Sequence, residues 1–323
     1  MRKELLFYVY FMKHFLMEFY LIISLWILSF FLIIIYIKHI QYTLLIINMS
    51  LVFNQQNVDK EIMEFVEVLG YNIRCLRFEK KGSRKTLILL HGLGASIERW
   101  AELFPLLRDY NVIVLDLIGF GYSEKPLIEY TVDFFVKFLE DFFMKLKITN
   151  PIIIGSSFGG QLILEYSLKH RDFFEKIILV SPAGTLERPT YVLSQYIFSG
   201  LYPTVENVQN AFQMMANNPS YHVDDNTVKD YINRMRLPNS KYALISTLLA
   251  MRRDQTLQKR LVEIAIPTLV IWGREDTTIP VENLEYFKQM PIVETHIMEG
   301  CGHTPYVEKP KEFYEIIKKF IES

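Results

Sequence analysis

The chain has 323 residues, and its 35 Lys and Arg nearly balance its 36 Asp and Glu, which gives a formal net charge of −1 at pH 7. This balance, without a long block of like charge, excludes the basic surface typical of a nucleic-acid-binding protein. Apolar residues make up 50% of the chain and charged residues 22%, which excludes a disordered protein. The two cysteines, Cys75 and Cys301, are too few for a disulfide scaffold or a four-cysteine zinc site. We therefore expect a folded core, no structural metal and no nucleic-acid partner.

The N-terminal segment, residues 1–53, is strongly apolar. Its residues 19–37 form a run of 19 without a charge, which is enough for a helix of roughly 28 Å that spans a bilayer. The sequence therefore predicts a membrane anchor with its spanning helix at about 19–37, and a single-pass membrane protein. A cleavable signal peptide is one alternative, although the run is longer than the apolar region of such peptides. A later translation start, at Met49 or Met63, is another.

The remainder, residues 54–323, alternates short runs rich in Ile, Val and Leu with helical patterns. This alternation is typical of an α/β fold in which a mostly parallel sheet is flanked by helices on both faces. Apolar residues recur at helical spacing over 132–146 and 313–320, which predicts two covering helices. Alternating patterns predict an antiparallel edge pair at 64–68 and 71–78. Further strands are expected at 86–90, 112–116, 151–154, 176–181, 268–272 and 293–298.

One interval interrupts this alternation. From about residue 185 to residue 262 the sequence has helical patterns and no strand-like run, which predicts an inserted helical cap. Its aromatic and Met residues either line an apolar substrate pocket or form the helices' own core face. These residues are Tyr191, Tyr196, Phe198, Tyr202, Phe212, Met214, Met215 and Met235.

The most informative motif lies at 155–159, which reads Gly-Ser-Ser-Phe-Gly between a predicted strand and a helical pattern. A strand, a G-x-S-x-G turn and a helix in this order are the context that a nucleophile elbow requires, because the sharp turn exposes the serine oxygen above the sheet. The two glycines let neighbouring backbone approach without a Cβ clash. The helix that follows directs its positive end and its first N–H groups at the site. Ser157 is therefore the candidate nucleophile.

A serine hydroxyl is a poor nucleophile at neutral pH, so it needs a general base and an acid that orients the base. His303 lies in a Gly-rich loop between the last predicted strand and the last predicted helix, and is the candidate base. Asp276 follows the strand at 268–272 and is the candidate acid, with Glu275 as an alternative. Serine, aspartate and histidine occur in this order along the chain, which is the order expected of this fold.

The loop after the strand at 86–90 begins His91-Gly92-Leu93-Gly94, whose small residues let the backbone approach a ligand. We assign the backbone N–H groups of Leu93 and Phe158 as the two donors of an oxyanion hole. His91 is interpreted as a residue that holds this loop by hydrogen bonds, with a role as the base as the alternative. Asp116, in the turn after another strand, is interpreted as the organiser of that turn.

Together these motifs resemble the α/β-hydrolase superfamily, over about residues 61–323 and including its helical cap. The single apolar segment before the domain, and Val-Ser-Pro-Ala-Gly at 180–184, are similar to the membrane-anchored monoacylglycerol lipase type. Carbon–carbon bond hydrolases of ring-cleavage products share the same core motifs and a similar cap. The resemblance implies a hydrolase with a Ser-Asp-His triad and no cofactor or metal.

Two enzyme functions follow. The first is a serine ester hydrolase that cleaves carboxylic esters of apolar acyl groups, including monoacylglycerol-like lipids, and contacts the membrane through its N-terminal helix. The alternative is a carbon–carbon bond hydrolase of ring-cleavage-type diketo acids, which would also need cationic residues for its acidic substrate. Candidates for these in the cap are Arg188, Arg234, Arg236, Arg252 and Arg253. A non-catalytic binding module would normally lack a member of the triad, and none is missing here.

Overall fold

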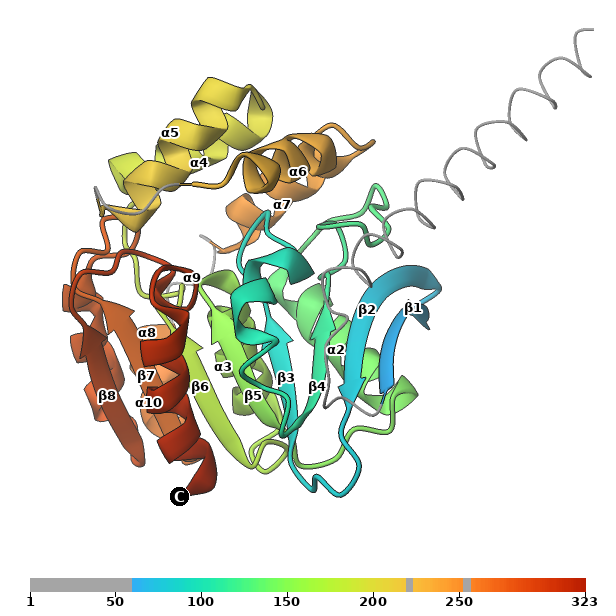
Figure 1. Ribbon diagram of the computed structural model, residues 1–323, viewed down its shortest axis with the longest axis vertical. Helices are drawn as coiled ribbons and strands as arrows, with labels where there is room; N and C mark the ends of the chain where they lie inside the picture. Colours follow the sequence, from blue (N-terminus) through green and yellow to red (C-terminus); the bar gives the residue numbers. More distant parts are fainter. Residues whose placement is uncertain (1–59, 219–222, 252–256) are drawn as a thin grey trace, which may run out of the picture. The chain divides into compact units, whose positions relative to one another are not determined.

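Eight strands form one sheet at the centre of the part of the chain that the structure describes (Figure 1). The computed structural model describes residues 60–218, 223–251 and 257–323, which belong to one unit, residues 57–323. The strands are β1 (Lys60–Val68), β2 (Tyr71–Glu79), β3 (Thr86–Leu90), β4 (Asn111–Leu115), β5 (Ile152–Ser156), β6 (Lys176–Val180), β7 (Thr268–Gly273) and β8 (Val293–Met298).

The strand order is β1-β2-β4-β3-β5-β6-β7-β8. β1 pairs with β2, and β2 with β4, in antiparallel register, whereas every other neighbouring pair is parallel. The predicted fold class, a mostly parallel sheet with an antiparallel edge pair, is therefore confirmed. Because β3 to β8 all run the same way, their carboxyl ends meet at one edge of the sheet, where ligands of open α/β sheets bind.

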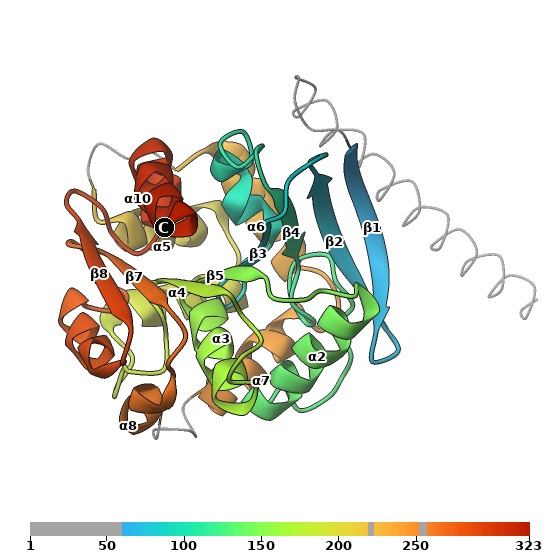
Figure 2. The same ribbon diagram turned by 90° about the horizontal axis from the view of Figure 1, so that it is seen from below.

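Helices cover both faces of the sheet, as Figure 2 shows from below. α2 (Val132–Lys145) and α3 (Phe158–Lys169) pack against each other on one face. α10 (Pro310–Glu322), α9 (Pro305–Glu308) and the 3₁₀ helix η1 (Ile97–Leu103) lie together on the other face. Short connections are α8 (Leu257–Arg260), η2 (Leu261–Glu263) and η3 (Val281–Gln289).

Four further helices lie between β6 and β7 in the sequence, and we refer to them as the cap helices. Figure 1 shows them above the carboxyl ends of the parallel strands. Side-chain oxygens cap the start of three of them: Thr190 accepts from Leu193, Thr204 from Asn207 and Asp224 from Thr227. The cap helices are α4 (Tyr191–Leu201), α5 (Val205–Ala216), α6 (Asp225–Met235) and α7 (Ser240–Met251).

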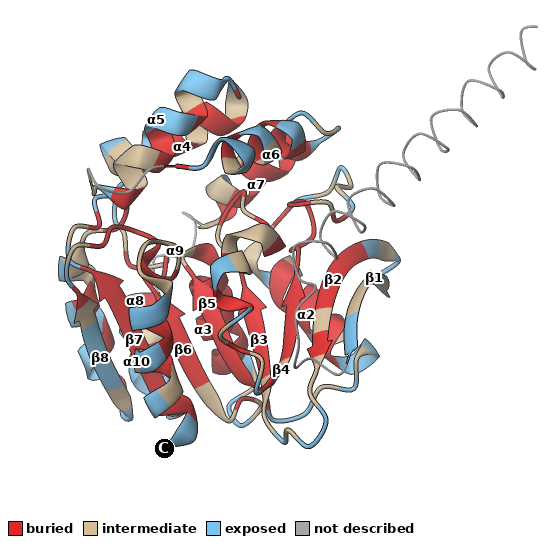
Figure 3. Ribbon diagram, in the orientation of Figure 1, coloured by how far each residue is buried: buried red, intermediate tan, exposed pale blue. Residues whose placement is uncertain are grey.

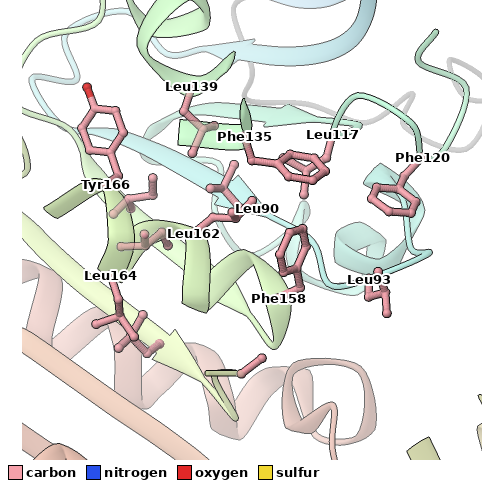
Figure 4. Packing of buried hydrophobic residues seen from close by; sticks show 14 of the residues in the cluster. Leu90, Leu93, Leu117, Phe120, Phe135, Leu139, Phe158, Leu162, Leu164 and Tyr166 are labelled. Atoms are coloured by element: carbon pink, nitrogen blue, oxygen red, sulfur yellow. The ribbon is translucent and has the colours of Figure 1, made fainter. Parts of the chain in front are cut away.

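The main core lies between the sheet and the helices α2 and α3. Figure 3 shows the central strands as buried and the edge strands β1 and β8 as partly exposed. Phe135 and Leu139 from α2 meet Leu162 and Tyr166 from α3 in this layer (Figure 4). Such spacing, three or four residues apart on each helix, produces the apolar stripe that faces a sheet. This core fixes α3, and therefore the residue at its start, against the sheet.

The predicted localisation, a single-pass membrane protein, is wrong on the structural evidence. Across residues 60–218, 223–251 and 257–323 there is no helix with both the length and the apolar character to cross a membrane. The longest helix there, α2, has 14 residues, or roughly 21 Å, against about 30 Å of bilayer hydrocarbon. The segment 19–37, where the anchor helix was predicted, lies outside the described residues.

Candidate active site

Ser157 occupies the turn between β5 and α3 with φ 53° and ψ −116°. A non-glycine residue in such a conformation costs about 1–3 kcal/mol and persists where the surroundings hold it. Its N–H donates to the carbonyl of Val180 at 2.9 Å, which holds the turn against β6. A Cβ on Gly155 would lie 2.8 Å from the Gly159 carbonyl, and one on Gly159 would lie 2.7 Å from the His91 carbonyl. The two glycines therefore permit the backbone contacts that the motif led us to expect.

Asp276 and His303 are joined by a hydrogen bond of 2.8 Å between Oδ2 and Nδ1, and both side chains are buried. Asp276 follows β7 and His303 follows β8, so both lie at the same edge of the sheet as Ser157. A carboxylate only accepts hydrogen bonds, so Nδ1 carries the proton and Nε2 is left to accept one. The second carboxylate oxygen, Oδ1, accepts the N–H groups of Thr278 and Ile279 at 2.8 and 2.9 Å.

The alternative acid, Glu275, does not bond to His303. Its Oε2 accepts the N–H of Cys301 at 2.9 Å instead. Glu308, which the sequence reasoning missed, accepts the N–H groups of Gly302 and Thr304 at 2.9 and 3.1 Å, while burial raises its pKa. Two carboxylates therefore hold the loop on both sides of His303. One signal in the sequence could have indicated this role: Thr304 directly precedes a helix, and Glu308 follows it four residues later, within reach of the N–H groups at the helix start.

The two predicted oxyanion-hole donors are the N–H groups of Leu93 and Phe158. Leu93 lines the same two cavities as Ser157, and Phe158 is the first residue of α3, directly after Ser157. Neither N–H donates to another described residue, although both residues are buried. Buried N–H groups without a partner are rare in proteins, so these two N–H groups remain the candidate donors to a bound oxygen atom. The Phe158 ring packs edge-on against Phe135 with centroids 5.0 Å apart, which anchors the first residue of α3 in the core (Figure 4).

His91 holds the loop that carries Leu93. Its Nε2 accepts the N–H of Leu117 at 3.0 Å, so its Nδ1 carries the proton and donates to the carbonyl of Gly92 at 2.8 Å. That carbonyl belongs to the same peptide group as the Leu93 N–H, whose direction is thereby fixed. Burial lowers the pKa of His91 to about 3. The loop-holding interpretation of His91 is therefore confirmed over a role as the base.

A cluster of buried charged residues stabilises the backbone after β3 and after β4. Asp116 accepts the N–H groups of Ile97 and Tyr122 at 2.8 and 2.7 Å, which confirms that it organises the turn after β4. Its carboxylate also pairs with Arg74 at 2.8 Å, and Arg74 pairs with Glu98. No sequence pattern predicts this cluster, because its members lie on separate elements that only the fold brings together.

Two cap residues contact the Leu93 loop directly. The Tyr196 hydroxyl of α4 donates to the carbonyl of Leu93 at 2.6 Å. Arg234 of α6 donates to the carbonyl of Gly94 at 3.3 Å and pairs with Asp230 at 2.8 Å. The cap helices therefore also hold the backbone beside Ser157.

Two cavities meet at Ser157. The larger, about 340 Å³, is lined mainly by apolar side chains, including Leu186, Leu193, Leu248 and Met251. The smaller, about 50 Å³, contains His303 and is lined by two guanidinium groups and by no Asp or Glu. These groups belong to Arg99 and Arg234.

The cap residues proposed for a pocket divide into four groups. Tyr196, Phe212 and Met215 line the smaller cavity, whereas Met235 belongs to the core. Tyr191, Phe198 and Tyr202 are exposed, and Met214 is half-buried outside both cavities. Of the cap arginines, Arg188 lines the larger cavity, Arg236 lines neither, and Arg252 and Arg253 lie outside the described residues.

A metal site was not expected from the sequence. Over the described ranges, no group of three or more His, Cys, Asp or Glu side chains is arranged to hold a metal ion.

The chain matches the α/β-hydrolase fold family over residues 85–310 and belongs to it, so it is a hydrolase of this fold. It is similar to a 2-hydroxy-6-oxo-6-(2'-aminophenyl)hexa-2,4-dienoic acid hydrolase of Metapseudomonas resinovorans. The two are 27% identical over 274 residues, which cover 80% of this chain and 91% of the relative.

Two solved structures illustrate the fold. The CarC enzyme, a serine hydrolase involved in carbazole degradation, is 25% identical, with a TM-score of 0.69 over 81% of this chain and 99% of that one. An esterase from Exiguobacterium antarcticum is 21% identical, with a TM-score of 0.70 over 81% of this chain and 100% of that one. The second likeness concerns the fold alone.

Proposed function

We propose that this chain is a serine hydrolase that cleaves carboxylic esters of apolar acyl groups through an acyl-enzyme on Ser157. The observation that carries the proposal is the 2.8 Å hydrogen bond between Asp276 and His303, because His303 lines the same cavity as Ser157. Residues 54–323 are the hydrolase domain in this proposal, and residues from about 185 to 262 are its cap.

In this mechanism Ser157 Oγ attacks the ester carbonyl carbon while His303 Nε2 takes the hydroxyl proton. Asp276 holds the imidazole in the tautomer that leaves Nε2 free, and it stabilises the imidazolium that forms. The N–H groups of Leu93 and Phe158 receive the negative charge of the tetrahedral intermediate. His303 then gives its proton to the leaving alcohol, and a water molecule activated by the same imidazole releases the acid.

The larger cavity is the feature that favours an apolar acyl group in the substrate. Its lining by Leu186, Leu193, Leu248 and Met251 offers apolar contact over a volume of about 340 Å³. Each buried methylene contributes up to about 0.8 kcal/mol, or roughly a fourfold gain in kcat/KM, until the cavity is full. We therefore propose medium-chain esters as substrates, and monoacylglycerol-like lipids among them.

A panel of p-nitrophenyl esters from acetate to dodecanoate tests this proposal. Values of kcat/KM should rise with chain length from acetate and then level off, and Ser157→Ala should remove the activity. Acetate as the best substrate would contradict the apolar acyl group, whereas unchanged activity of Ser157→Ala would contradict the nucleophile.

The second candidate is hydrolysis of a carbon–carbon bond in a ring-cleavage-type diketo acid. It is favoured by the smaller cavity, where Arg99 and Arg234 face no lining carboxylate. Arg234 is paired with Asp230, whereas Arg99 bonds to the Thr304 hydroxyl at 3.1 Å and has no described carboxylate within 4 Å. A guanidinium that has no carboxylate partner and lines the same cavity as Ser157 suits an acidic substrate. The relative from Metapseudomonas resinovorans acts on such an acid by its name.

Direct comparison of the two substrate classes separates the candidates. If a diketo acid of this type is hydrolysed with a higher kcat/KM than any p-nitrophenyl ester, the second candidate replaces the first. Arg99→Gln should then lower kcat/KM for the acid at least about tenfold and leave the neutral esters nearly unchanged.

A further inference from the structure

Gln161 is a fully buried polar residue in the wall of the larger cavity. Neither its amide oxygen nor its amide nitrogen has a hydrogen-bond partner among the described residues. An amide that offers two donors and an acceptor is normally bonded when it is buried. Because the side chain lines a cavity next to the nucleophile, a bound molecule is the natural partner.

Two threonines of the same cavity share this property. Thr185 and Thr278 are each 2% exposed, and neither hydroxyl oxygen bonds to another described residue. The backbone of both residues is fixed, because Gln258 donates to the Thr185 carbonyl at 2.5 Å and the Thr278 N–H donates to Asp276 at 2.8 Å. Three side chains from three separate segments of the chain therefore place polar atoms without a protein hydrogen-bond partner at one cavity.

The backbone holds Gln161 in place. A Cβ on Gly184 would lie 3.3 Å from Gln161 Cγ and 3.5 Å from Cδ, so the backbone at Gly184 packs closely against the amide stem. Gly184 has a backbone φ of +100°, which residues other than glycine rarely adopt. The N–H of Gln161 donates to the carbonyl of Ser157 at 3.1 Å, which places the two residues one helical turn apart on one face of α3.

The charge of this group of side chains limits what it binds. The charged residues of the larger cavity are Glu187 and Arg188, and both are exposed. A buried amide and two hydroxyls recognise an uncharged oxygen better than an ion, because none of them supplies a counter-charge. Gln161 and Ser157 are one helical turn apart, which is about 5.4 Å along the axis. An oxygen bound by Gln161 would therefore lie a few covalent bonds from the substrate carbonyl that Ser157 attacks.

We propose that Gln161, Thr185 and Thr278 form a neutral hydrogen-bonding subsite that binds a hydroxyl or keto oxygen of the substrate, a few bonds from the scissile carbonyl. The inference rests on the proposed role of Ser157. It adds that the substrate is an oxygenated ester, with an apolar part beyond the oxygen, and that Gln161 is the main specificity-determining residue.

Two matched substrate pairs test the subsite. The acyl pair is p-nitrophenyl 4-oxopentanoate and p-nitrophenyl pentanoate, and the alcohol pair is 1-butyrylglycerol and propyl butyrate. Rates are divided by those of alkaline hydrolysis to remove intrinsic reactivity. We expect the wild-type enzyme to prefer the oxygenated member of at least one pair by about tenfold, because its polar groups stay unpaired with the other member.

In Gln161→Leu this preference should fall to within about twofold of unity, because kcat/KM should fall more for the oxygenated ester than for the ester without the extra oxygen. Thr185→Val should lose part of the preference. Gln209→Leu is the matched control, because Gln209 is exposed on α5 outside both cavities, and its preference should equal that of the wild type. The melting temperature of Gln161→Leu should not fall, since no protein hydrogen bond is lost.

A wild-type enzyme without preference in either pair would overturn the subsite, as would a preference that Gln161→Leu and Thr185→Val both retain. A lower melting temperature of Gln161→Leu at unchanged preference would identify Gln161 as a structural residue. Failure of the proposed function gives a different result: all four esters are then hydrolysed equally by the wild type and Ser157→Ala, or not at all.

Discussion

Asp276 and His303 are joined by one hydrogen bond of 2.8 Å, and the aspartate is itself fixed by two backbone N–H groups on its other oxygen. The neighbouring Glu275 turns to the N–H of Cys301. The two adjacent carboxylates after β7 thus have separate roles: Asp276 bonds to the imidazole, and Glu275 holds the loop that precedes His303.

This division predicts a large difference between two conservative substitutions. Asp276→Asn should lower kcat for p-nitrophenyl butyrate by about 10⁴, because the amide favours the wrong tautomer of His303. Glu275→Gln keeps an oxygen that accepts from Cys301 and should lower kcat less than about threefold. Steady-state kinetics and thermal melts of both variants measure this. The opposite order of effects would assign the orienting acid to Glu275.

The contact between Tyr196 and the Leu93 carbonyl predicts that the cap supports the oxyanion hole. Tyr196→Phe removes only the hydroxyl and should lower kcat about tenfold with little change in KM, less than the 10²–10³ lost with a donor itself. The matched control is Tyr202→Phe, at the exposed end of the same helix, which should keep wild-type kinetics. If Tyr196→Phe raised KM and left kcat unchanged, Tyr196 would contact the substrate instead.

The lowered pKa of His91 predicts a loss of stability in acid. Burial holds its folded-state pKa at about 3, whereas an unfolded histidine titrates near 6.5. Between these values the unfolded chain binds a proton that the folded chain does not, so the free energy of unfolding decreases as the pH falls from 6.5 to 3.

Urea unfolding at pH 7 and pH 5 measures this effect. The wild type should lose about 2 kcal/mol more than His91→Gln between the two pH values, since each pH unit in the window contributes about 1.4 kcal/mol. Equal losses in the two proteins would show that His91 titrates in the folded state as it does in the unfolded chain, which would contradict the lowered pKa.

Much of the fold was predictable because its signals are local. The runs 86–90 and 293–298 became strands with the predicted bounds. At 86–90 the signal is a run of Ile and Leu residues between turns, which is typical of a buried strand. The elbow at Ser157 was visible for the same reason, as its strand, turn and helix are contiguous. The 3₁₀ helices η1 and η3 were missed, because segments of seven and nine residues are too short for a helical pattern to stand out.

The parts of the site that escaped prediction depend on distant residues. Arg74 meets Asp116 only because β2 pairs with β4, and no spacing in the sequence reports that pairing. Gln161 looked like an ordinary polar residue of a helix. Its burial follows from the packing of α3 against the sheet and from the close approach of Gly184, which are tertiary features. The predicted anchor at 19–37 was inferred from hydropathy alone and lies outside the described residues.

Labelling with a fluorophosphonate probe tests the central claim most directly, because the probe forms a covalent bond only with an activated serine. The purified protein should be labelled on the peptide that contains Ser157, as determined by mass spectrometry, and Ser157→Ala should not be labelled while it keeps the wild-type melting temperature. Labelling of Ser157→Ala, or of a serine other than Ser157 in the wild type, would contradict the account.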